Sequence, residues 1–109
     1  MLERNGVVAS CPWAGRVPYE TVIAPTEPDA AGLDSELLAP ALKLLAEVVR
    51  RLQQLEGQVP LNTWLEHSPS DWRLVLFPRL NVLAGLELGA SIFVNTVPPE
   101  EAAFRLREL

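Results

Sequence analysis

The chain has few residues with which to hold a metal ion or to form a covalent cross-link. Its 109 residues include one cysteine, Cys11, and one histidine, His67. A zinc site within one chain needs three or four ligands, which one Cys and one His do not provide. A single cysteine excludes an intramolecular disulfide and is typical of a reducing compartment. We therefore expect no metal, no cofactor and a cytoplasmic location.

The sequence also lacks a long apolar run and an excess of positive charge. Its longest apolar stretch, near residues 80–94, is interrupted by Gly85, Glu87 and Gly89, and the N-terminus has no apolar signal core. Neither segment provides the roughly 20 apolar residues that a membrane span needs. Nine basic residues against 14 acidic ones give a net charge of -5, which would repel a phosphate backbone. These features predict neither a membrane nor a nucleic-acid partner.

What the chain does have is apolar side chains. Hydrophobic residues make up 49% of the sequence and charged residues 21%. This composition is typical of a folded chain, and the length predicts one domain over residues 1–109. The apolar content is high enough to suggest that a partner covers part of the surface.

The hydrophobic periodicity predicts an α+β fold. Residues 37–55 show helical spacing, with Gly57 as the stop. Either the helix begins near Ala39, with Pro40 in its first turn, or the first turn is distorted. A second, short helix follows Pro98 and Pro99. Alternating or β-branched segments predict five strands, at residues 6–11, 19–24, 61–66, 72–77 and 90–95. The resulting order, β-β-α-β-β-β-α, predicts an antiparallel sheet of about five strands with the long helix on one face.

The strand at residues 72–77 has two apolar faces. If Trp72 and Leu74 face the helix, then Arg73, Val75 and Phe77 share the opposite, open face. An apolar open face with one arginine predicts either an interface or a pocket, because a guanidinium binds phosphate or carboxylate well. The alternative is that Arg73 pairs with a neighbouring carboxylate.

Several segments together resemble a known family. They are Ala-Ser-Cys-Pro-Trp-Ala-Gly-Arg-Val-Pro-Tyr-Glu at residues 9–20, Asn-Thr-Trp-Leu-Glu at 62–66, Asp-Trp-Arg-Leu-Val-Leu-Phe-Pro-Arg at 71–79, Ala-Gly-Leu-Glu-Leu-Gly-Ala-Ser-Ile-Phe-Val-Asn at 84–95 and Val-Pro-Pro-Glu-Glu-Ala-Ala at 97–103. This set is similar to the C-terminal lobe of galactose-1-phosphate uridylyltransferase, of the histidine-triad (HIT) superfamily. The resemblance covers residues 6–106 and implies the HIT-like α+β fold.

The chain departs from that pattern where the family carries histidine. The family has Asn-x-x-Leu-His on the third strand and His-Trp-His-x-x-x-x-Pro-Arg on the fourth. The three histidine positions are Glu66, Asp71 and Arg73 in this sequence. By the resemblance, the imidazole nucleophile belongs to the other lobe and the His-Trp-His of this lobe is associated with a metal. A guanidinium stays protonated and cannot replace an imidazole nucleophile. The resemblance therefore implies the scaffold without the chemistry, and no catalytic residue.

Two interpretations stay open for the acidic pair, Glu66 and Asp71, and two for His67. Glu66 and Asp71 are either a general acid and base or partners of Arg73 in a local ion pair, and such surface pairs are common. His67 is either a shifted base or an exposed histidine of a hairpin loop. Strand alternation points it away from the face of Glu66, which favours the second reading.

A ligand site is predicted from the residues that the resemblance and the charge pattern single out. Its members are Asn62, Arg73, Arg79 and Glu87, the last between Gly85 and Gly89. Such a site would take a nucleotide or a sugar phosphate. The simpler reading leaves Arg79 solvated and Glu87 exposed or bound to backbone amides.

Three functions follow from these observations. The first is a catalytically degenerate HIT-like domain that acts by association, as a homodimer or with a related HIT-like lobe in a larger assembly. The second is a nucleotide-binding or sugar-phosphate-binding sensor without turnover. The third is a residual nucleotidyl transferase or hydrolase that uses Glu66, His67 or Asp71.

Overall fold

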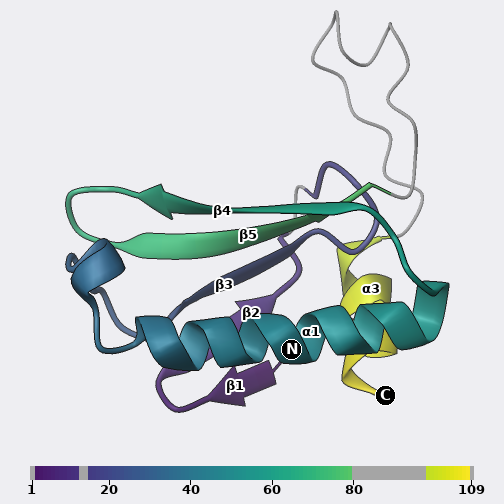
Figure 1. Cartoon of the computed structure of the whole chain (residues 1–109), viewed down its shortest axis with the longest axis horizontal. Coiled ribbons are helices and arrows are strands. Elements are labelled where there is room, and N and C mark those ends of the chain that lie inside the picture. The colour runs from purple at the N-terminus through teal and green to yellow at the C-terminus, as the bar shows by residue number, and fades with distance from the viewer. Residues whose placement is uncertain (1, 13–14, 80–97, 109) are drawn as a thin grey trace, which may run out of the picture.

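The fold is seen in a computed structural model that describes residues 2–12, 15–79 and 98–108. The elements are listed here in chain order: β1 (Leu2–Arg4), β2 (Val7–Ser10), β3 (Thr21–Pro25), the 3-10 helix η1 (Gly32–Asp34), α1 (Leu38–Glu56), β4 (Leu61–His67), β5 (Trp72–Pro78) and α3 (Pro99–Arg107). Figure 1 shows α1 lying across one face of the sheet, with α3 beside its C-terminal end.

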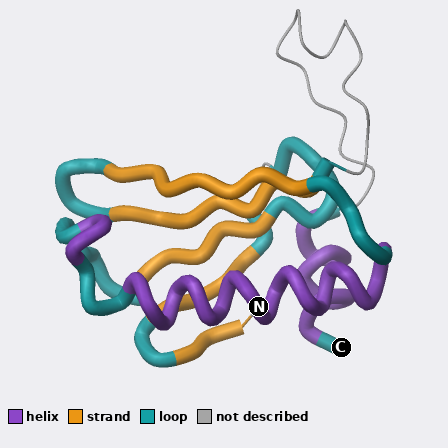
Figure 2. The backbone as a smooth tube through the Cα atoms, viewed as in Figure 1, coloured by secondary structure: helices purple, strands orange, loops and turns teal. Residues whose placement is uncertain are grey.

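The strands form one antiparallel sheet. Its five strands have the order β1-β2-β3-β5-β4, so β4 and β1 are the two edges among the described strands (Figure 2). The β4–β5 hairpin pairs Leu61 with Pro78 at one end and His67 with Trp72 at the other. This register fixes which side chains share a face of the sheet.

The apolar stripe of α1 explains why the helix packs on the sheet. Ala41, Leu44, Val48 and Leu52 are buried and join the core with strand residues such as Ile23. Pro40 lies in the first turn, where its missing N–H costs no helical hydrogen bond. The helix ends at Glu56, and the following Gly57 has a positive φ of 74°, which glycine adopts readily.

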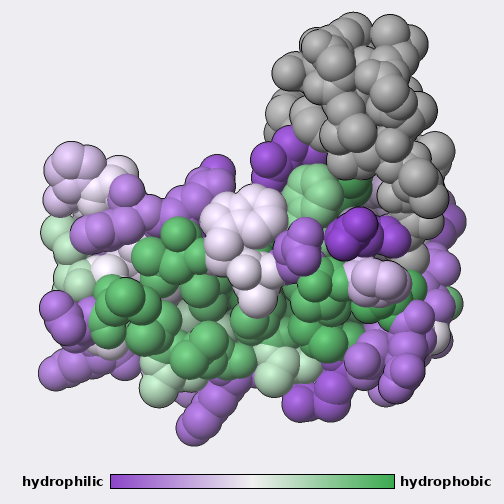
Figure 3. Space-filling model, turned by 45° about the horizontal axis from the view of Figure 1, so that its top comes forward, coloured by the Kyte–Doolittle hydropathy of each residue, from purple (hydrophilic) through white to green (hydrophobic). Residues whose placement is uncertain are grey.

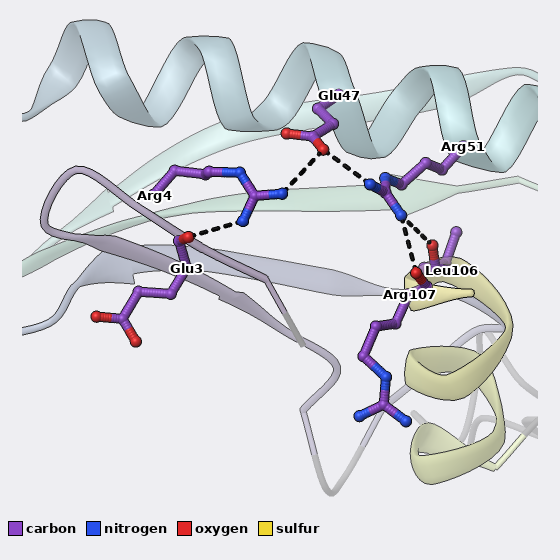
Figure 4. A network of polar contacts seen from close by, with 6 residues as sticks. All are labelled: Glu3, Arg4, Glu47, Arg51, Leu106 and Arg107. Atoms are coloured by element: carbon purple, nitrogen blue, oxygen red, sulfur yellow. Dashed lines mark hydrogen bonds and ion pairs between the residues drawn. The ribbon is translucent and has the colours of Figure 1, made fainter. Parts of the chain in front are cut away.

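The C-terminal helix α3 is held against α1 by one arginine. Nη1 of Arg51 donates to the carbonyl oxygens of Leu106 and Arg107, both at 3.0 Å, and Nη2 donates to Glu47 at 2.9 Å (Figure 4). Arg4 of β1 reaches the same Glu47 carboxylate at 3.4 Å. The carbonyls at the end of a helix carry partial negative charge, so a cation here stabilises α3.

The structure confirms the predicted α+β class, with an antiparallel five-stranded sheet, one long helix and a short C-terminal helix. The strand predicted at residues 90–95 lies outside the described residues. The edge strand β1, Leu2–Arg4, was not predicted, because three residues are too few to show an alternating pattern. None of the described helices is long and apolar enough to span a membrane.

Candidate functional site

The acidic Glu66 and the basic Arg73 of the hairpin are in direct contact. Glu66 of β4 lies opposite Arg73 of β5, and Arg73 Nε donates to Glu66 Oε2 at 2.6 Å. The second carboxylate oxygen, Oε1, accepts a hydrogen bond from Trp64 Nε1 at 3.1 Å. Both contacts favour the ionised carboxylate. The hydrogen bond from Arg73, followed by that from Trp64, therefore lowers the pKa of Glu66. The predicted local ion pair is thus formed between Glu66 and Arg73.

Asp71 is used by the turn between the two strands. Its Oδ1 accepts from the backbone N–H of Trp72 at 2.8 Å. The Ser68 N–H donates to the Asp71 carbonyl at 2.8 Å, and the Ser68 hydroxyl accepts from the Asp71 N–H at 3.2 Å. These contacts close the turn. Asp71 therefore stabilises the turn, whereas Glu66 pairs with Arg73, and the two carboxylates do not share a proton.

A hollow of about 260 Å³ opens at this end of the hairpin. The lining residues come from the end of β3, from β4, from the turn and from β5: Ala24, Glu66, His67, Ser68, Asp71, Trp72 and Arg73. Glu66, Asp71 and Arg73 therefore contribute to one concave surface. Carboxylates on that surface repel an anion, whereas Arg73 attracts one.

His67 is exposed and is engaged by a loop. It pairs with Trp72, which belongs to the helix-side core, and so it lies on the face opposite to Glu66. Its Nε2 lies 3.1 Å from the carbonyl oxygen of Ala30. Gly32 packs against the ring so closely that a Cβ there would approach it to 3.1 Å. The position and contacts of His67 are those of an exposed hairpin histidine, the simpler of the two readings.

The same loop is tied to the hairpin through Asp29, which the sequence analysis did not single out. Asp29 Oδ2 accepts from Trp72 Nε1 at 3.1 Å, and Oδ1 accepts from the Ala31 N–H at 3.0 Å. The Ser35 hydroxyl also donates to this carboxylate. These three donors, with Ser35 first, lower the pKa of Asp29. The local turn around Pro28 and Asp29 was a detectable signal, but its partner Trp72 is 43 residues away.

The predicted ligand residues are divided between the two ends of the hairpin. Asn62 lies opposite Phe77, and the Arg79 N–H donates to the Pro60 carbonyl at 2.8 Å, just beyond the pair of Leu61 and Pro78. Arg79 lies six steps along the chain from Arg73, about 20 Å at roughly 3.3 Å per step of extended strand. The structure therefore places Asn62 and Arg79 at the end away from the hollow. Glu87 lies outside the described residues.

Between these ends, the open face of the sheet is covered by Arg16. Its guanidinium carbon lies 5.0 Å from the ring centre of Phe77 and 5.7 Å from that of Trp64. The guanidinium donates to both carboxylate oxygens of Glu20, each at 3.1 Å, and the side chain of Glu20 is 7% exposed. The sequence analysis missed this cluster, since no spacing rule connects Arg16 to strands about 50 residues later.

The remaining candidates support neither metal nor thiol chemistry. Over residues 2–12, 15–79 and 98–108, no three His, Cys, Asp or Glu side chains are grouped so that they could hold a metal ion. Cys11 packs against the core, and burial raises the pKa of its thiol. A raised pKa leaves little of the reactive thiolate at neutral pH.

The chain is similar in sequence and in fold to known proteins. No family model matches the chain. An ADP-glucose phosphorylase from Arabidopsis thaliana is 25% identical over 98% of the chain, which spans 34% of that relative. The solved structure of an ADP-glucose phosphorylase from the same plant, with bound ADP-glucose, superposes with a TM-score of 0.87 over 98% of this chain and 39% of that one.

Two further structures share the fold. A uridylyltransferase has a TM-score of 0.81 at 24% identity, over 98% of this chain and 39% of its own. A Hit-like protein involved in cell-cycle regulation from Bartonella henselae has a TM-score of 0.72 at 17% identity, over 98% of this chain and 82% of its own. The chain thus spans well under half of its larger relatives. Its fold is HIT-like, and over nearly its whole length the chain is similar to the ADP-glucose phosphorylase and to the uridylyltransferase.

Proposed function

We propose that this chain is a HIT-like domain that acts by association, with a second copy of itself or with a related HIT-like lobe, and that it does not catalyse nucleotidyl transfer. The chain corresponds to 34% of the length of the phosphorylase that it resembles. A second lobe would supply more of that length. Two points of the resemblance support the absence of catalysis: the imidazole nucleophile belongs to the other lobe, and the histidine positions of this lobe are Glu66, Asp71 and Arg73.

The observation that carries this proposal is the edge strand β4. It is seven residues long, and among the described strands it pairs with β5 on one side. Long edge strands present unpaired N–H and C=O groups to which a strand of another chain can add. β4 is therefore the favoured site of association.

The backbone groups of β4 that point outward can be identified. The Arg79 N–H donates to the Pro60 carbonyl, and the Ser68 N–H donates to the Asp71 carbonyl. The even-numbered residues of β4 therefore form the hydrogen-bonded pairs with β5. Antiparallel pairs alternate, so the odd-numbered residues direct their N–H and C=O groups away from β5. They are Leu61, Thr63, Leu65 and His67. The same set on a second copy can pair with them about a two-fold axis.

Apolar side chains beside this edge extend the surface. Leu42 of α1 is 50% exposed, and other residues of α1 and β4 are half-buried at the margin of the core: Leu38, Leu45, Val49, Leu61 and Leu65. Figure 3 shows hydrophobic surface running along the molecule on the side of α1 and β4. A second copy paired at β4 would cover this apolar strip, which adds hydrophobic area to the backbone hydrogen bonds.

The mass of the protein in solution tests the association. At micromolar concentration, size exclusion with light scattering should give twice the chain mass of 12.0 kDa. Thr63→Pro removes an outward N–H without removing a bond to β5 and should weaken the dimer at least tenfold, on the order of 1.4 kcal/mol. Thr63→Val keeps the N–H and the branched shape and is the matched control. A wild-type monomer at these concentrations contradicts the homodimer and leaves association with a related lobe.

A second candidate function is the binding of a nucleotide sugar without turnover. It is favoured by one observation, the likeness of the chain to a phosphorylase structure that holds ADP-glucose. The hollow with Arg73 is the concave surface available for the phosphate. A thermal-shift panel of ADP-glucose, uridine-diphosphate sugars and sugar phosphates tests it, because a ligand at about 100 times its Kd adds roughly 2.7 kcal/mol of stability. A flat panel removes this candidate and leaves the association.

A further inference from the structure

Arg73 and Glu66 face solvent in the hollow at the end of the hairpin. Their side chains are 48% and 39% exposed, and the contact between them is 2.6 Å long. The Glu66 carboxylate is held in place at its other oxygen by the indole N–H of Trp64. A carboxylate is therefore fixed against a guanidinium inside a cavity that is open to ligands.

A guanidinium recognises carboxylate and phosphate through the same planar fork of N–H groups. The polar residues that line the hollow together with Arg73 are Glu66, His67, Ser68 and Asp71. Of these, the Glu66 carboxylate is the group in direct contact with the guanidinium. Asp71 is held by its own turn, and the ring of His67 is bonded to Ala30. Glu66 is the residue whose place an incoming oxyanion would have to take.

We propose that the hollow is a phosphate-group site built on Arg73 and that Glu66 blocks it as an internal competitor. Ser68 also lines the hollow, and its hydroxyl donates to the Asp71 carbonyl at 3.2 Å. Because an exposed ion pair has a small net stability, an anion that also contacts other parts of the hollow can displace Glu66. The inference rests on the second candidate function, which locates the ligand in the hollow. It adds that Glu66 keeps this site closed.

Three variants test the competitor directly. Glu66→Gln keeps the shape and the acceptor for Trp64 but removes the charge. Glu101→Gln is the matched control, since it removes the same charge from another exposed glutamate that pairs with an arginine, Arg105. Glu66→Gln with Arg73→Gln removes the proposed binding group as well. Glu66→Ala replaces Glu66→Gln if that variant is unstable.

The probe is inorganic phosphate, titrated at constant ionic strength and followed by thermal shift. Glu66→Gln should bind phosphate at least tenfold more tightly than the wild type. Glu101→Gln should match the wild type, and the double variant should lose the gain. Equal binding by Glu66→Gln and the wild type, or a gain that survives in the double variant, overturns the proposal.

ADP-glucose titrated into the same variants distinguishes the source of the phosphate. A parallel gain points to a phosphate ester as the ligand, whereas a gain with inorganic phosphate alone points to the free anion. If the wild type does not bind ADP-glucose, the second candidate function is excluded. The comparison of phosphate binding between Glu66→Gln and its control is not altered.

Discussion

The two faces of β5 are made of similar side chains but have different surroundings. Trp72, Leu74 and Leu76 face α1 and belong to the core cluster. Val75 and Phe77 share the opposite face with Arg73. That face has the Arg16 guanidinium over its aromatic rings where the first face has a helix.

The difference teaches that hydrophobicity alone does not separate a core from a candidate interface. Val75 on the open face is as fully buried as the core residues, because neighbouring side chains cover it. Arg73, two residues earlier on the same face, is half exposed and pairs with Glu66. One strand thus contributes to a closed core on one side and to a partly exposed, charged surface on the other.

Truncation of one residue on each face tests this comparison with the largest expected effect. Leu76→Ala should lower the free energy of unfolding by about 2 to 5 kcal/mol, because it leaves a cavity beneath α1. Phe77→Ala on the open face should cost less, since that ring is only half-buried. Urea denaturation of both variants measures the difference. An equal loss would show that the open face is as tightly packed as the core.

Removal of Arg16 should have the next largest effect. Glu20 is buried and would lose the partner that compensates its charge. We expect Arg16→Ala to cost about 2 kcal/mol, less than a fully buried pair because Arg16 is 38% exposed. Glu20→Gln added to Arg16→Ala should restore part of the stability. Arg4→Ala, which breaks a longer and more exposed pair with Glu47, is the control.

Acid should weaken the contacts around the hollow before it weakens the core. The pKa values of Asp29 and Glu66 are lowered in the folded protein by Ser35 and Arg73 respectively, each the leading hydrogen-bond donor. A lowered folded pKa adds stability above the unfolded pKa, and that stability is lost as pH falls through the folded value. The urea midpoint should therefore drop below about pH 4, the ordinary range for carboxylates.

Asp29→Asn isolates the contribution of the loop to this acid sensitivity. It should reduce the difference between the midpoints at neutral and acid pH. Asp34→Asn, which removes an exposed carboxylate from the adjacent 3-10 turn, is the charge control. Identical pH profiles for wild type and Asp29→Asn would contradict the assignment.

The smallest effect on stability is expected for an ion pair that is exposed and lines no cavity. Glu101 and Arg105 lie one turn apart on the exposed side of α3. Glu101→Gln should leave the urea midpoint within error of the wild type, because such pairs contribute little. A clear loss would mean that α3 depends on this pair as well as on Arg51.

The sequence analysis predicted much of the fold and part of the site. The helix, with Pro40 in its first turn, and the hairpin of β4 and β5 follow from local periodicity, and the structure confirms them. The predicted ion pair formed because Glu66 and Arg73 are close in sequence across a short turn. Asn62 and Arg79 lie at the other end of the hairpin from Arg73, because a strand keeps its two ends apart, and their role in ligand binding stays a prediction.

The sequence by itself determined the fold class and the two faces of β5, because the periods of helix and strand decide which side chains can be buried together. The tertiary structure decided which groups became partners. Asp29 reaches Trp72 across 43 residues, and Arg16 reaches Trp64 and Phe77. Long-range pairing depends on how the chain folds back on itself, and no local pattern encodes that path. The hollow and the place of β4 at the edge of the described sheet are products of that folding.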